Sequence, residues 1–321
     1  MRIKFFPLLL AAMLPLTAAV AQDYPKQPIR FVVPFTPSGG TDIVARLLGQ
    51  KMSAAMGQPI LVENRPGAGS QIGTEYVAAS PPDGYTVLLS SSSSLTIPYL
   101  RKASFELPRD FTPIGQVGIG TFALVVSPKL PFKTAGEFIA AAKANPGKYS
   151  YASAGSGSAG HLALELLRSK TGADLVHVPY KSSGEVANSI ISGQVDASID
   201  ILTIEKGFID NGQVRALATT GIARDPTLPQ VPTLNETGAV PGGYDLTYWY
   251  GLFVPAKTPA PVVKRLQHEF ETAMKDPEIL ARLKTLQIQP STMTAAQFKE
   301  NVQTEAAMWK KLIGEKGIRA D

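Results

Sequence analysis

Two loops rich in glycine and hydroxyl side chains carry the residue types that could bind an anion. The first spans residues 36–42 (Thr-Pro-Ser-Gly-Gly-Thr-Asp), and the second spans residues 153–161 (Ser-Ala-Gly-Ser-Gly-Ser-Ala-Gly-His). Each follows a short apolar run and precedes residues with helical spacing, so each should open a helix. Glycine lets the backbone approach a ligand, and the amide groups at a helix N-terminus attract negative charge. We therefore predict an anion seat at each loop.

Further polar side chains follow two other predicted strands. The serine run at residues 90–94 comes directly after one strand, and Asp200 lies at the carboxyl end of another. Ligands of parallel α/β sheets bind outside the carboxyl ends of the strands, so these side chains should face the same cleft. The predicted ligand-binding residues are Phe35, Thr36, Ser38, Gly39, Gly40, Thr41, Asp42, Ser91, Ser92, Ser153, Ala154, Gly155, Ser156, Ser158, His161 and Asp200.

Serine and histidine lie close together in the second loop, which raises the alternative of a hydrolase. Ser156 or Ser158 would attack the substrate, with His161 as the base. The esterase elbow needs glycine two positions before and two positions after the serine. Neither serine meets this requirement, because Ala154 stands two positions before one and Ser156 two positions before the other. We predict that the chain is not an enzyme and keep a periplasmic serine hydrolase as an alternative.

Cofactor and metal sites are poorly supported. The glycines at 155, 157 and 160 match the dinucleotide-binding spacing, but the next strand ends at residues 178–181 without the acidic residue that binds the ribose. The three histidines lie far apart in the sequence, and the chain has no cysteine. We predict no cofactor and no metal.

The elements that must position these loops alternate between short strands and helices. Strands at residues 29–33, 60–64 and 85–89 form a first parallel α/β unit, and the pattern restarts after a long strand at residues 111–127. An aromatic strand at residues 245–254 returns to the first unit, and helices complete the chain. This predicts an α/β fold of two lobes, each a mainly parallel sheet flanked by helices, with two crossover strands and a cleft between them. We place lobe 1 at residues 22–122 and 246–321, and lobe 2 at residues 123–245.

Composition indicates an exported protein. Residues 1–21 combine a charged start, a short apolar run and a small-residue ending, as in a signal peptide cleaved after Ala21. The absence of cysteine excludes a lipid anchor on an N-terminal cysteine, which favours the periplasm. The formal charge of +5 falls to +3 once Arg2 and Lys4 leave with the signal, and the chain has no basic run, so a nucleic acid partner is not expected.

The order of several short motifs resembles the periplasmic substrate-binding proteins of tripartite tricarboxylate transporters, the Bug family. Each motif is weak alone, but their order over residues 28–256 is specific. The motifs are PFTPSGGTDIVAR (34–46), ENRPGAG (63–69), PDGYT (82–86), YASAGSGSAGHL (151–162), HVPYK (177–181), GQVD (193–196), RALA (215–218) and PQVPT (229–233).

This resemblance implies a type II, Venus-flytrap binding protein that closes about a hinge, traps a small carboxylate and delivers it to the large and small membrane subunits of a permease. It implies that residues 35–42 and 153–161 hold a ligand carboxylate and that Asp200 matches the strand-end aspartate. The chain departs from the family pattern at Ser38 and Ser182, where glycine is common, and at Ser156, where asparagine is frequent. Its extra hydroxyls and the aromatics near Trp249 look most similar to the terephthalate-binding member.

We therefore predict capture of a di- or tricarboxylate, which could be aromatic, by a monomeric periplasmic protein without a membrane anchor. A sensor whose closed form meets a membrane receptor is a further alternative, because the sequence does not distinguish a receptor from a permease.

Overall fold

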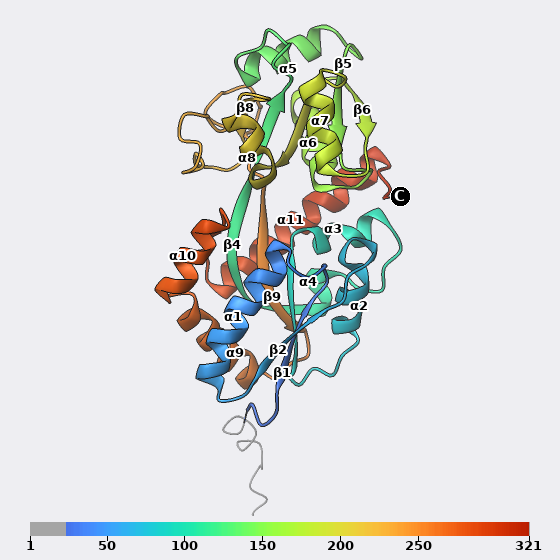
Figure 1. The fold of residues 1–321 in the computed structure, drawn as a ribbon. Coiled ribbons are helices and arrows are strands. Elements are labelled where there is room, and N and C mark those ends of the chain that lie inside the picture. Colours follow the sequence, from blue (N-terminus) through green and yellow to red (C-terminus); the bar gives the residue numbers. More distant parts are fainter. Residues whose placement is uncertain (1–23, 321) are drawn as a thin grey trace, which may run out of the picture.

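The computed structural model describes residues 24–320, so the predicted signal peptide at residues 1–21 lies outside the described residues. The described chain forms two α/β lobes placed end to end, with two long strands running between them (Figure 1). The crossing strands are β4 (Phe111–Val126) and β9 (Thr247–Pro255). Both were predicted from their sequence as connections between the lobes.

Lobe 1 contains the first and last elements of the chain. In order, these are β1 (Ile29–Val33), α1 (Gly40–Met56), β2 (Ile60–Asn64), η1 (Ala68–Ser70), α2 (Gln71–Ala78), β3 (Thr86–Ser91), α3 (Ser93–Leu100), α4 (Leu107–Asp110), α9 (Ala260–Ala273), α10 (Pro277–Thr285), β10 (Gln289–Pro290) and α11 (Ala295–Lys316). Lobe 2 contains α5 (Ala135–Ala144), β5 (Tyr149–Ser153), α6 (Ala159–Thr171), β6 (Leu175–Pro179), α7 (Ser183–Ser192), β7 (Ala197–Ile201), α8 (Leu202–Asp210) and β8 (Arg215–Thr219).

Strand β4 belongs to both lobes and joins their sheets in the order β2-β1-β3-β9-β4-β7-β5-β6. Its pairing changes abruptly, since Thr121 is the last residue opposite β9 and Phe122 is the first opposite β7. We propose that the lobes divide one residue after this change, as residues 22–122 with 246–321 and residues 123–245.

The three outer strands of each sheet are parallel. In lobe 1, β1 pairs in parallel with β2 and β3, and in lobe 2, β5 pairs in parallel with β6 and β7. The crossing strands are antiparallel to their neighbours. The α/β, mainly parallel, two-lobed fold predicted from the sequence is confirmed.

Apolar faces on both sides of the strands hold the lobes together. Alternate residues of β1 face opposite layers, with Phe31 packed against α1 and Val32 in the cluster that also contains the α11 side chains. Because both faces are covered, the strands are apolar throughout. Helix α11 packs on β4 and α3, so that the C-terminal segment lies between the two lobes (Figure 1).

Several short elements escaped sequence prediction. The serine run, expected to follow a strand, contains the end of β3 and the start of α3. Ser94 is buried between the hydroxyls of Ser70 (2.7 Å) and Ser90 (2.5 Å). These reciprocal hydrogen bonds satisfy side chains that would otherwise favour a loop.

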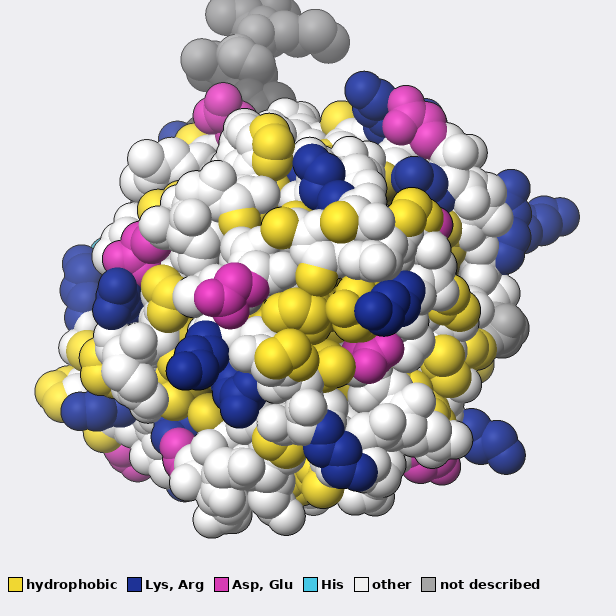
Figure 2. All heavy atoms as spheres, turned by 90° about the horizontal axis from the view of Figure 1, so that it is seen from above, with side chains coloured by type: hydrophobic (Ala, Val, Ile, Leu, Met, Phe, Trp, Pro, Cys, Tyr) yellow, Lys and Arg dark blue, Asp and Glu magenta, His cyan; other side chains and the backbone are white. Residues whose placement is uncertain are grey.

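Within residues 24–320, no helix has the length and apolarity needed to cross a bilayer. On the outer face of lobe 2, Lys and Arg side chains are interspersed with Asp and Glu around a central group of apolar side chains (Figure 2).

Candidate functional site

The first predicted anion seat lies where β1 ends and α1 begins. Helix α1 starts at Gly40 with Gly39 as its N-cap, and Thr41 and Asp42 lie in its first turn. The Asp42 carboxylate instead accepts hydrogen bonds from the Ser38 amide (2.9 Å), Arg46 (3.0 Å) and Asn64 (2.9 Å). These donors outweigh burial and hold the pKa of Asp42 below its usual range. The aspartate therefore shapes the loop from within as a permanent anion.

Two backbone positions in this loop are sterically demanding. Ser38 has a φ of 68°, in the left-handed region that glycine adopts more readily. A Cβ atom on Gly40 would lie 2.9 Å from the Tyr250 hydroxyl oxygen, so the helix start touches the crossing strand β9. Of the other predicted residues here, Phe35 contributes its carbonyl to a hydrogen bond from Asn64 (3.1 Å), and Thr36 is exposed.

The second predicted seat is a true helix start. Ser158 is the N-cap of α6, and its hydroxyl accepts a hydrogen bond from the backbone N–H of His161 (3.4 Å). The His161 Nδ1 atom accepts a hydrogen bond from the Gly157 amide (2.9 Å), which is a contact within the loop. Gly155 and Gly157 have φ values of 105° and 79°, which explains the glycine content of the loop.

The rings of His161, His177 and Tyr151 form a stack beside this loop. The His161 and His177 rings lie 4.0 Å apart at an interplanar angle of 5°, and Tyr151 stacks on His177 at 4.7 Å. The Ser153 hydroxyl lies 2.6 Å from the His177 Nε2 atom and 3.1 Å from the Gly155 carbonyl oxygen. The alternative hydrolase would use Ser156 or Ser158 with His161, and the structure brings a further serine and histidine, Ser153 and His177, into contact.

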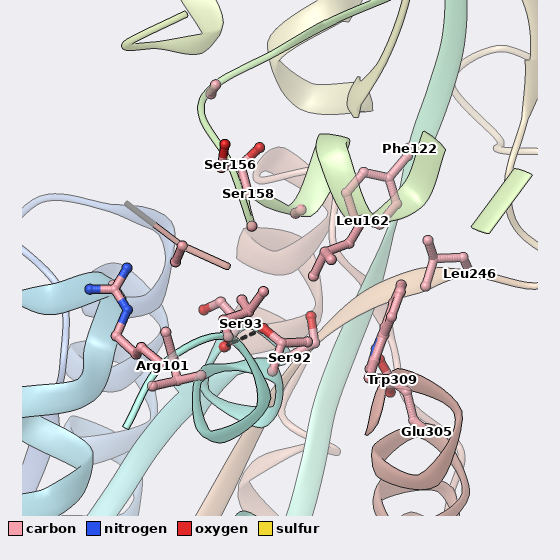
Figure 3. A pocket seen from close by; sticks show the side chains of 18 of the residues that line it. Ser92, Ser93, Arg101, Phe122, Ser156, Ser158, Leu162, Leu246, Glu305 and Trp309 are labelled. Atoms are coloured by element: carbon pink, nitrogen blue, oxygen red, sulfur yellow. Dashed lines mark hydrogen bonds between the residues drawn. The ribbon is translucent and has the colours of Figure 1, made fainter. Parts of the chain in front are cut away.

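One cavity of about 290 Å³ lies between the lobes and collects hydroxyl groups from both (Figure 3). Lobe 1 contributes Ser92 and Ser93 at the start of α3, and lobe 2 contributes Ser156 and Ser158 from the second loop. The rest of the wall is largely apolar. It includes Ile97, Leu100, Phe122, Leu162, Leu246 and Trp309.

The cavity contains part of the predicted site. Ser92, Ala154, Ser156 and Ser158 line it, whereas the first loop does not. The predicted residues outside its wall are Phe35, Thr36, Ser38, Gly39, Gly40, Thr41, Asp42, Ser91, Ser153, Gly155, His161 and Asp200.

Two tyrosines on β9 form a chain of contacts between the first loop and the carboxyl end of β7, where Asp200 lies. Tyr250 packs against Gly40, and the hydroxyls of Tyr250 and Tyr248 share a hydrogen bond. Tyr248 also bonds to Thr203 at the start of α8, three residues after Asp200. Burial raises the pKa of both tyrosines, so they stay neutral donors and acceptors at physiological pH.

Two ionisable side chains line the cavity, and neither was predicted as a site residue. Arg101 follows α3, and Glu305 lies on α11, where its carboxylate accepts from the indole N–H groups of Trp249 (2.7 Å) and Trp309 (3.0 Å). Glu305 and Trp309 are spaced i and i+4, which places both on one helix face. That spacing was visible in the sequence, but no local pattern indicated that this face of α11 turns toward the cleft.

A second opening adjoins the cavity, sharing Ser156 with it. It is lined by His161, Glu165 and Arg168 of α6 and by residues 316–319 after α11. Arg168 is already paired with Glu165 and with Asp174 (3.2 Å). Across residues 24–320, no cluster of three or more His, Cys, Asp or Glu side chains has the geometry of a metal site.

Comparison with known proteins assigns the family. Residues 44–318 match the model described as "Tripartite tricarboxylate transporter family receptor". The chain is 32% identical to protein BugT of Bordetella pertussis over 302 residues, covering 93% of this chain and 92% of that protein.

Two solved structures with ligands in their descriptions have the same fold. An R. palustris protein with adipate is 31% identical, with a TM-score of 0.74 over 92% of this chain and 99% of that one. MatC from Rhodopseudomonas palustris with bound malate is 29% identical, with a TM-score of 0.72 over 90% of this chain and 100% of that one. Together, the family match, the near-complete coverage and the interlobe cavity place this chain in the tripartite tricarboxylate transporter receptor family, as its motifs indicated.

Proposed function

We propose that this protein is an extracytoplasmic solute-binding protein that captures a small dicarboxylate between its lobes and delivers it to the membrane subunits of a tripartite tricarboxylate-type transporter. The observation that carries the proposal is the interlobe cavity with hydroxyl groups from both lobes. Hydroxyls and helix-start amides donate hydrogen bonds to carboxylates, and bonds to a charged acceptor are the stronger kind. The relatives with adipate and malate support this ligand class.

The apolar wall suits the carbon skeleton of the ligand. Phe122, Leu162 and Trp309 offer hydrophobic and aromatic surface beside the serines. A six-carbon chain or a benzene ring would bury its apolar surface there while its carboxylates reach the polar groups. Adipate and terephthalate are therefore the first ligands to test, and malate is a shorter comparison.

Capture would close the cleft by population shift. A ligand held by Ser92 of lobe 1 and by Ser156 and Ser158 of lobe 2 makes all its contacts only when the lobes approach. It therefore favours the closed state by the difference in its affinity for the two states. The closed form would be the one that meets the transporter.

A thermal-shift panel tests the ligand class. Adipate, terephthalate and malate are compared with dimethyl adipate, which has the same skeleton without charge. We expect at least one dianion to raise the melting temperature, because a ligand that binds only the folded state stabilises it by mass action. No shift with any dianion, or an equal shift with the neutral ester, would contradict the proposal.

A serine variant tests the cavity as the site. Ser156→Ala should weaken dianion binding about tenfold, the effect of losing one charge-assisted hydrogen bond. Ser80→Ala is the matched control, since the Ser80 hydroxyl donates to Tyr76 at the end of α2 and lies outside the cavity wall. Equal affinity in the two variants would move the ligand away from this cavity.

A further inference from the structure

Glu305 joins three parts of the molecule at the cavity wall. It lies on α11, bonds to Trp249 on the crossing strand β9 and to Trp309 on its own helix, and borders the cavity with Trp309 (Figure 3). Trp249 and Trp309 are the two tryptophans in the sequence. A carboxyl group in the wall of a cavity proposed to hold anions is unexpected, because two like charges in a poorly hydrated space repel each other.

The surroundings of Glu305 favour its neutral form. Burial, with a further contribution from the nearby Asp245 carboxylate, raises the pKa of Glu305 to about 7 despite the two indole donors. Burial also raises the pKa of Asp245 itself. The other charged side chain in the cavity wall is Arg101, from the segment that follows α3. On α4, which also packs on α11, Arg109 and Asp110 are paired with each other (2.7 Å).

We propose that Glu305 couples anion capture to proton uptake. When a dianion enters the cavity, one proton moves from solvent to a Glu305 carboxylate oxygen, which removes the repulsion between ligand and wall. The cleft therefore binds anions best where Glu305 is protonated. This inference rests on the proposed function, since it needs an anion in the cavity.

The coupling makes affinity depend on pH in a range where the ligand itself does not titrate. Carboxylic acids ionise near pH 4 and a dicarboxylate is almost completely ionised by pH 6.5, whereas Glu305 changes charge near pH 7. If the bound anion raises the pKa of Glu305 by about one further unit, linkage predicts a Kd roughly sixfold weaker at pH 8.5 than at pH 6.5. At pH 7, binding should take up about 0.4 proton per ligand.

The free protein offers a direct readout of Glu305. Because both tryptophans donate to this carboxyl group, intrinsic fluorescence should titrate with a midpoint near pH 7, as charge-assisted hydrogen bonds weaken on protonation. Glu305→Gln should remove that transition. Glu300→Gln, an exposed residue of the same helix, should keep it. A wild-type protein without a transition between pH 6 and 8 would overturn the inference without any ligand being needed.

Calorimetry with adipate and terephthalate, in two buffers of different ionisation enthalpy, then counts the protons. We expect uptake by the wild type and by Glu300→Gln, and none by Glu305→Gln, whose Kd should be independent of pH. Proton uptake that persists in Glu305→Gln comes from other groups and overturns the inference.

The two proposals fail in different ways. Binding of a dianion with a constant Kd and no proton uptake rejects the role of Glu305 and leaves the proposed function intact. Absence of binding at every pH rejects the proposed function, while the fluorescence titration still reports on Glu305. The wild-type measurements do not depend on the folding of any variant.

Discussion

At the scale of single residues, the most exceptional group is Glu205 on α8. Its side chain is completely buried, and neither carboxyl oxygen has a hydrogen-bond partner. Burial and the neighbouring Asp200 carboxyl raise the pKa of Glu205 to about 8. Burial likewise raises the pKa of Asp200, although the Ile201 amide (2.7 Å) and Ser183 donate to it. The folded protein therefore keeps Glu205 protonated at neutral pH, and this lowers the free energy of unfolding.

Replacing Glu205 should stabilise the protein in a pH-dependent way. The folded pKa lies above the unfolded one, so the cost is absent below about pH 4.5, grows as the pH rises and levels off above pH 8. We expect Glu205→Gln to raise the free energy of unfolding by about 4 kcal/mol at pH 8 and by little at pH 4.5. Urea unfolding at both pH values measures this. The exposed Glu271→Gln is the control, and a gain that is equal at both pH values would contradict the argument.

At the scale of elements, Gly160 determines how closely α6 approaches its sheet. A Cβ atom there would lie 2.4 Å from the backbone carbonyl oxygen of Ile199 on β7, which cannot move without disturbing the sheet. Gly160 thus allows α6, which begins with Ser158 as its N-cap and has His161 in its first turn, to pack closely on β7. Its role is packing, although its spacing with Gly155 and Gly157 imitates a dinucleotide-binding motif.

A pair of glycine variants tests this packing. Gly160→Ala should destabilise the protein by about 1–3 kcal/mol through overpacking. Gly136→Ala on α5 meets no atom closer than 3.9 Å and should be neutral or stabilising by up to about 1 kcal/mol, since alanine is the better helix former. Thermal or urea unfolding of both variants decides, and equal effects would remove Gly160 from this role.

The sequence predicted elements better than it predicted their mutual contacts. Alternation of apolar strands and helical spacing predicted the crossing strand near residue 111 and the helix that the second loop opens, because these signals are local. The cavity wall could not be found in this way. Trp309 and Glu305 lie about 150 residues after the second loop, and only the folded chain brings α11 against it. The role of Asp42 was missed for a similar reason, since its partner Asn64 comes from another strand.

At the scale of the whole molecule, β4 and β9 form the connection about which the lobes would move. A contact between lobes also crosses this region, because Asp225 of lobe 2 accepts from Thr121 (3.0 Å) and from Gln289 of lobe 1 (3.3 Å). Hinge closure in two-lobed proteins is absorbed by a few residues in such connections. The lobes should otherwise move as rigid bodies.

Small-angle scattering tests this motion. Addition of a bound dianion should lower the radius of gyration by a few per cent, because the closed state brings the lobes together. Dimethyl adipate, without charge, is the matched control. A dianion that binds in calorimetry and leaves the scattering curve unchanged would show that capture occurs without closure.

The segment after α11 has a practical consequence. Ala320 borders the interlobe cavity, and its amide donates to the Leu100 carbonyl oxygen of α3 (3.3 Å). An affinity tag fused beyond Ala320 would begin beside the interlobe cavity, where it would compete with a ligand or hold the lobes apart. Expression vectors for binding studies should therefore carry a removable tag at the other end of the chain.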